Sequence, residues 1–142
     1  AHRAGGIDLR TAREAARRDP ETVRQVITLG SPFGGNPKAN KIKDVYEKLS
    51  GNRVDCPMAD RRFAIGEQPL DVPSTSIFSK SDGISAWQNC ISLPHPMAEN
   101  VEVHSSHFGL VVNPNVYHVI GDRLAQPKEL WTPYVVPVKA AS

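Results

Sequence analysis

The sequence predicts an α/β fold, with a short parallel sheet of about three strands and crossover helices. Two observations predict it: short apolar runs end in turn residues, and segments with helical spacing alternate with these runs along the chain. Such alternation favours parallel strands, because each strand must return by a crossover to lie beside its neighbour. The length of 142 residues suits one domain spanning 1–142.

The first helix and the first strand are recognised by their boundaries. Residues 7–18 are rich in Ala and Arg and predict a helix, which the Asp-Pro pair at 19–20 ends. Residues 23–30, VRQVITLG, form a short apolar run before Gly-Ser-Pro and predict a buried strand. Turn residues dominate 31–40 and predict a loop.

A helical insert is expected between the first strand and the second. Residues 41–51 carry apolar side chains at helical spacing and end in Gly, so they predict a helix. Residues 52–72 show little periodicity and predict a loop with a short helix.

Two more strands are expected in the second half of the chain. Residues 72–79, VPSTSIFS, predict the second strand, 80–83 a tight turn, and 84–91 one or two helical turns. After an irregular stretch at 93–100, the sequence VEVH at 101–104 predicts the third strand.

The last helix follows a loop. Residues 105–113 predict that loop, and 114–125 predict a helix with Val116, Ile120 and Leu124 on one face. Pro114 is compatible with the first turn of this helix. The tail, 131–142, is expected to lie along the surface.

Two polar turns directly follow strands, and they carry the chemistry. Asp82 comes after the second predicted strand and His107 after the third. In a parallel sheet both lie at the carboxyl edge, where active sites of open α/β folds form. An Asp followed by a His on successive loops matches the order of the acid and the base in hydrolases of this kind.

Longer motifs surround both residues and carry a resemblance to a known family. The segments are RQVITLGSPFGGNPKAN, VPSTSIFSKSDGISAWQNC and NVEVHSSHFGLVVNPNVYHVIGDRLAQP. Together they resemble bacterial α/β-hydrolases of the esterase/lipase type, in order and spacing, over residues 10–131. The motifs Ser-x-x-Asp-Gly-x-x-x-Trp and Ser-His-x-Gly-Leu-x-x-Asn-Pro are far more specific than a lone Asp and a lone His.

The resemblance implies roles for particular residues. Asp82 corresponds to the acid and His107 to the base, while an insert at about 36–70 corresponds to the small cap over the pocket. Phe33 and Pro32 are expected to line that pocket, although Phe33 also suits a core position. With so few strands, the chain corresponds to the C-terminal half of an α/β-hydrolase fold.

The nucleophile is where the sequence departs from the family pattern. A member carries Gly-x-Ser-x-Gly at a strand-to-helix turn. If the Gly pair at 5–6 closes that turn, Arg3 occupies the nucleophile position; if the following helix sets the register, Gly6 does. Arginine stays protonated and glycine has no side chain, so neither replaces the serine.

Ser31 is the alternative nucleophile. It stands in LGSPF at the carboxyl end of the first predicted strand, at the same edge as Asp82 and His107. A Gly-Ser-Pro sequence is also an ordinary turn, in which the serine hydroxyl bonds to nearby backbone. The turn role is the stronger expectation.

Composition excludes several other classes of function. A net charge of +2 argues against nucleic acid as a partner, although six arginines crowd the first 24 residues. No apolar run is long enough for a membrane span, and no signal peptide is visible. We therefore expect a cytoplasmic location, with a secreted mature form as the alternative. The scattered histidines predict no metal site and no cofactor is implied; Cys56 and Cys90 can pair or remain free thiols.

Two functions follow from these observations. The first is hydrolysis of a small carboxylic or lipid ester by an Asp-His-assisted nucleophile, weak or incomplete because the usual serine is absent. The second is a catalytically inactive module that binds a partner chain, or a second copy of itself as a homodimer, through the exposed edge of the sheet.

Overall fold

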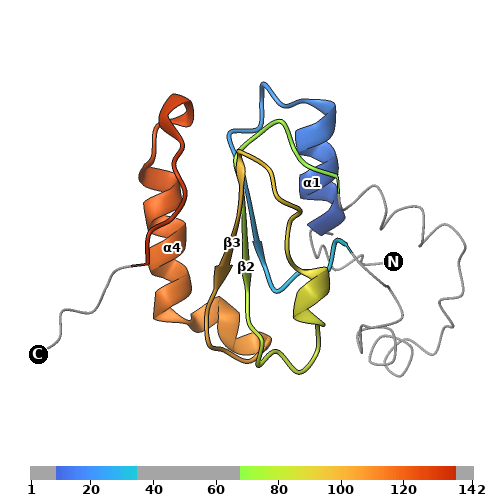
Figure 1. Cartoon of the computed structure of the whole chain (residues 1–142), viewed down its shortest axis with the longest axis vertical. Coiled ribbons are helices and arrows are strands. Elements are labelled where there is room, and N and C mark those ends of the chain that lie inside the picture. The colour runs from blue at the N-terminus through green and yellow to red at the C-terminus, as the bar shows by residue number, and fades with distance from the viewer. Residues whose placement is uncertain (1–8, 35–67, 137–142) are drawn as a thin grey trace, which may run out of the picture.

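The computed structural model describes residues 9–34 and 68–136, which form a helix, three strands and a second long helix (Figure 1). In chain order these are α1 (Leu9–Arg18), β1 (Val26–Leu29), β2 (Ser74–Phe78), β3 (Ala98–Glu102) and α4 (Pro114–Ala125). Short 3-10 helices at Trp87–Asn89, Phe108–Val112 and Lys128–Leu130 lie between and after them.

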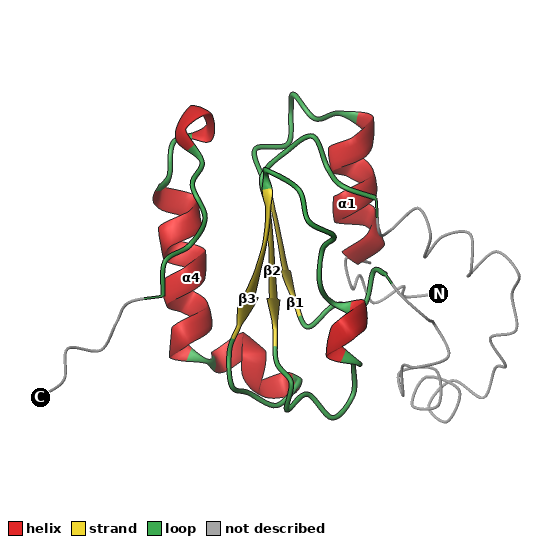
Figure 2. Cartoon of the chain, in the orientation of Figure 1, coloured by secondary structure: helices red, strands yellow, loops and turns green. Residues whose placement is uncertain are grey.

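The three strands form one parallel sheet in the order β1-β2-β3. Leu29 of β1 and Val101 of β3 both lie opposite Ile77 of β2, so these three side chains share one face. Figure 2 shows α1 and α4 on opposite sides of the sheet. The parallel α/β arrangement expected from the alternating pattern is therefore present.

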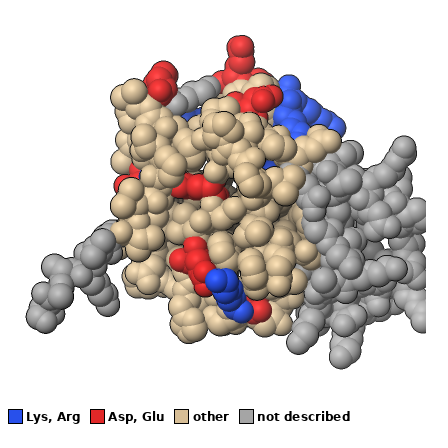
Figure 3. Space-filling view, in the orientation of Figure 1, with Lys and Arg blue, Asp and Glu red and all other residues tan. Residues whose placement is uncertain are grey.

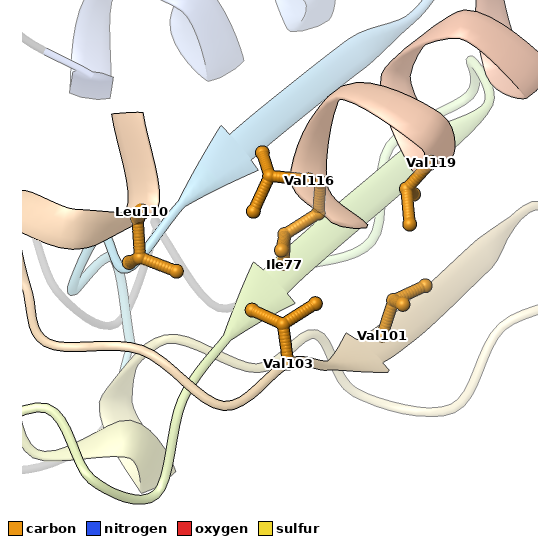
Figure 4. Packing of buried hydrophobic residues seen from close by; sticks show 6 residues of the cluster. All are labelled: Ile77, Val101, Val103, Leu110, Val116 and Val119. Carbon is orange, nitrogen blue, oxygen red and sulfur yellow. The ribbon is translucent and has the colours of Figure 1, made fainter. Parts of the chain in front are cut away.

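α4 covers the more apolar face of the sheet. The close view in Figure 4 shows Val116 and Val119 of α4 above the strands, within a buried cluster completed by Ile77, Val101, Val103 and Leu110. Burying each of these side chains contributes about 2 kcal/mol. The helix begins at Pro114 because Asn113 caps it: the Asn113 side chain accepts a hydrogen bond of 2.9 Å from the Asn115 N–H.

The opposite face is smaller and more polar. Ala16 of α1 is fully buried in a cluster with Val26, Leu70 and Val72. Ser74 and Ser76 of β2 are also buried, and the Ser76 hydroxyl bonds to that of Ser92 at 2.9 Å. Buried hydroxyls need such partners, so a serine-rich strand remains compatible with a covered sheet.

Several predicted boundaries need correction. β1 spans only Val26–Leu29 within the predicted 23–30, and β3 begins at Ala98 and ends at Glu102 rather than spanning 101–104. Residues 98–100 read as irregular because two of them are polar. Tertiary contacts satisfy both: Glu99 binds Arg123 at 3.0 Å, and the Asn100 side chain bonds to both backbone groups of Ser92.

Two further expectations concern segments outside the strands. The predicted loop 105–113 contains the 3-10 helix Phe108–Val112, whereas α4 matches the predicted 114–125. The predicted helix at 41–51, nearly all of the cap at 36–70, and the residues Arg3, Gly6 and Cys56 lie outside the described part of the chain.

Candidate active site

Asp82 and His107 meet at the carboxyl end of the sheet. Asp82 lies in the turn after β2, and His107 follows β3 at the start of a 3-10 helix. The His107 Nδ1 atom lies 2.7 Å from Asp82 Oδ2. The structure thus brings together the two side chains that the sequence placed at one edge, 25 positions apart in the chain.

The turn after β2 fixes the Asp82 carboxylate. Its Oδ1 accepts hydrogen bonds from the backbone N–H groups of Ile84 at 2.8 Å and Ser85 at 2.9 Å. The side chain is only 2% exposed, so both oxygens are engaged away from water. A carboxylate held in this way accepts the Nδ1 proton of the imidazole and leaves Nε2 as the proton acceptor.

His107 is the accessible partner of the pair. Its side chain is 26% exposed, against 2% for Asp82. The Phe108 ring stands edge-on to the imidazole with centroids 5.6 Å apart, and the backbone carbonyl of His107 accepts from the Leu110 N–H at 3.4 Å. A buried acid behind a partly exposed base suits proton transfer to a bound molecule.

Gly30 packs directly behind this pair. Its N–H donates to the Ile77 carbonyl at 2.8 Å, which extends the β1–β2 pairing by one residue, and its φ is +53°. A Cβ at this position would stand 2.6 Å from Leu110 Cδ1, 3.1 Å from Asp82 Oδ2 and 3.4 Å from His107 Nδ1. Only glycine fits here without displacing Leu110 and crowding the Asp82 carboxylate.

Ser31 is buried in the turn that follows Gly30. Its hydroxyl is in a residue only 3% exposed and donates to the Leu29 carbonyl at 2.8 Å. This is the local backbone bond that a Gly-Ser-Pro turn predicts. Among the described residues, no hydrogen bond joins Ser31 to His107, so the structure does not bring this predicted site residue into the pair.

Phe33 and Pro32 follow in the same loop. Phe33 is 2% exposed, and its ring lies under the Arg13 guanidinium, 4.0 Å from centroid to Cζ. Its backbone N–H donates to the Asn89 carbonyl at 3.0 Å. Pro32 is half-buried. In the described part of the chain, Phe33 is thus a packing residue against α1.

Sequence reasoning missed two contributors to the site. Gly30 carries a weak signal, a lone Gly before Ser-Pro, which reads as an ordinary turn. Ser79 carries a better one, because it is the first residue of the Ser-x-x-Asp-Gly motif. It is 1% exposed, and its hydroxyl bonds to the loop that carries His107.

Other polar groups lie apart from the pair. His104 is exposed, with Nδ1 3.3 Å from the Ser81 hydroxyl. Cys90 is a buried free thiol whose pKa burial raises to about 12, with the negative charge of Asp82 acting in the same direction. Within residues 9–34 and 68–136, no cluster of three His, Cys, Asp or Glu side chains is arranged to hold a metal ion.

A groove of about 500 Å³ lies elsewhere on the molecule. It runs between β3, α4 and the segment at 134–136, and neither Asp82 nor His107 lines it. Figure 3 shows basic side chains gathered over the upper end of α1, while much of the remaining described surface in that view is uncharged. None of the described helices is long and apolar enough to cross a membrane.

Comparisons with known proteins assign no family to this chain. Neither the protein-family models, nor the curated proteins, nor the solved structures gave a match to this chain. The interpretation of the site therefore depends on its own geometry.

Proposed function

We propose that this chain carries the acid and base of an α/β-hydrolase that cleaves carboxylic esters, including lipid esters. The single observation that carries the proposal is the 2.7 Å hydrogen bond between a buried Asp82 and a partly exposed His107. The parallel sheet supports it, since the two residues follow successive strands of the kind on which such sites are built. The proposed reaction needs no cofactor.

In the proposed mechanism, the two side chains act as one unit. Asp82 accepts the Nδ1 proton of His107, fixes the tautomer and stabilises the imidazolium once it forms. The Nε2 atom takes a proton from the nucleophile as the ester carbonyl is attacked, and returns it to the leaving alcohol. General base catalysis of this type contributes about 10²–10⁴-fold in rate.

The nucleophile limits the activity that we propose. The positions that correspond to the family serine, Arg3 or Gly6, lie outside the described residues and carry no hydroxyl. The Ser31 hydroxyl is engaged with the Leu29 carbonyl. We therefore expect weak hydrolysis, because loss of one triad member leaves only the residual rate from substrate binding and the remaining groups.

The test is hydrolysis of a short-chain nitrophenyl ester by the whole chain. We expect slow turnover that falls to the buffer rate in His107→Ala and in Asp82→Asn. His118→Ala is the matched control, because His118 is an exposed histidine on α4 and outside the pair. Turnover that is unchanged in His107→Ala would contradict the proposal. Mass spectrometry after organophosphate treatment identifies the nucleophile, and we expect no label on Ser31.

A second candidate function is a catalytically inactive binding module. Within the described residues β1 pairs only with β2, so its other edge has no strand partner there. An unpaired edge of this kind can accept a strand from a partner chain or a second copy. Light scattering over a range of concentrations tests it: a mass of two chains without ester hydrolysis favours the module, whereas a monomer with His107-dependent turnover excludes it.

A further inference from the structure

Asp82 and His107 lie in the loops that follow β2 and β3. Where the backbone pairing of these two segments ends, a side chain joins the loops. The last backbone bond between the two segments runs from the Val103 N–H to the Phe78 carbonyl, at 2.9 Å. One residue further, the Ser79 hydroxyl donates to the Ser105 carbonyl at 2.7 Å and accepts from the Ser105 N–H at 3.1 Å.

From this geometry we infer that Ser79 is a positioning residue, which sets the separation of Asp82 and His107 by joining their two loops. The inference rests on the proposed function only in giving this separation a catalytic purpose. Among the described residues, no hydrogen bond joins the Ser79 hydroxyl to either side chain of the pair. Ser79 acts through the backbone of Ser105, two residues before His107, and through its own turn, in which the Asp82 N–H donates to the Ser79 carbonyl at 3.3 Å.

The surroundings of Ser79 shield this contact from water and add further hydrogen bonds to it. The residue is 1% exposed, so water does not compete for the hydroxyl. It also accepts from the Ser81 N–H at 3.2 Å, which closes the turn that leads to Asp82. The Ser81 hydroxyl reaches the same Ser105 carbonyl at 3.1 Å, from a more exposed position. One buried oxygen therefore bonds to both loops.

Removing this oxygen should loosen the pair before it unfolds the protein. In Ser79→Ala the Ser105 N–H loses its partner, while the Ser105 carbonyl keeps only the exposed Ser81 hydroxyl. A half-buried backbone N–H that loses its partner destabilises its loop. The loop ends can then separate without disturbing the backbone pairing of β2 and β3, so the Asp82–His107 hydrogen bond opens more often.

Proton NMR of the His107 Nδ1–H tests the inference. We expect a resolved signal in the wild type, and exchange of this proton with water that is about tenfold faster, or a lost signal, in Ser79→Ala. Ser76→Ala is the matched control: Ser76 lies on β2, three residues before Ser79, is equally buried, and its hydroxyl bonds to Ser92. Loss of the Ser76 hydroxyl should lower the free energy of unfolding without changing the His107 signal.

A folded Ser79→Ala protein with an unchanged His107 signal would overturn the inference, as would an equal change in Ser76→Ala. If Ser79→Ala does not fold, Ser79→Cys replaces it with the same two outcomes, because a thiol forms weaker hydrogen bonds at the same place. The measurement needs no substrate. A chain without ester hydrolysis but with faster exchange in Ser79→Ala would reject the proposed function and retain the positioning role.

Discussion

At the scale of single residues, the Asp82–His107 contact depends on Gly30 as well as on its own two side chains. Gly30 has no side chain and therefore leaves room for the pair and for Leu110. Its backbone adopts a positive φ, which most residues avoid, and its Cα faces the Leu110 side chain and the two members of the pair. Both constraints act on one position, so we expect this glycine to tolerate substitution poorly.

Gly30→Ala should therefore destabilise the protein, because the new Cβ displaces Leu110 and crowds the Asp82 carboxylate. The new Cβ would come within 2.6 Å of Leu110 Cδ1, which forces the buried side chains apart at a cost of about 1–3 kcal/mol. Urea unfolding measures this loss. Gly121→Ala is the control, since a Cβ there meets nothing within 4 Å and alanine favours a helix by up to ~1 kcal/mol. Equal midpoints for the two variants would contradict the argument.

At the scale of elements, α4 is joined to the sheet by a buried ion pair in addition to its apolar face. The Arg123 side chain is 1% exposed and the Glu99 side chain 8% exposed, with 3.0 Å between Nη1 and Oε1. Glu99 also accepts from the Thr75 hydroxyl at 2.7 Å and from the Tyr134 N–H. One carboxylate thus connects β3, β2, α4 and the segment after it.

Arg123→Met should lower the free energy of unfolding by about 3–5 kcal/mol, because it leaves the Glu99 charge buried without its cation. The exposed pair of Arg18 and Glu14 on α1 is the comparison, with side chains 77% and 56% exposed. Arg18→Met should cost less than about 1 kcal/mol. Urea midpoints separate the two cases, and similar losses for both arginines would show that burial does not matter here.

The elements that were predicted well are those fixed by their own sequence. α4 has its cap and its proline in adjacent positions, so 114–125 could be predicted from a short window. The start of β3 could not, since Glu99 and Asn100 enter the strand only because Arg123 and Ser92 satisfy them from elsewhere. The same distinction applies to the site. Parallel strands predict that Asp82 and His107 meet, whereas the Ser79 contact forms after the pairing of β2 and β3 has ended and could not be predicted in this way.

At the scale of the whole molecule, different kinds of contact stabilise the two ends of the sheet. The Arg123–Glu99 pair joins the elements at the end where β3 begins, and the Ser79 and Gly30 contacts position the loops at the opposite end. Cys90 lies close enough to Asp82 for its thiol to sense that charge, with 1% of its surface exposed. Its thiol therefore reports on opening of the layers around the site.

Because burial raises the pKa of Cys90 from 9.0 to about 12, alkaline pH should destabilise the folded chain. Between these values the unfolded thiol has lost a proton that the folded thiol keeps, so the free energy of unfolding falls as pH rises. We expect a loss of about 1 kcal/mol between pH 9 and pH 10 from this group. The contribution of Cys90 is the free energy of unfolding of the chain with Cys90 minus that of Cys90→Ala, measured by urea unfolding at each pH in a Cys56→Ser background. This difference removes the contribution of other titrating groups. A difference that stays constant across this range would mean that the thiol ionises as readily in the folded chain, and that the layer over it opens to water.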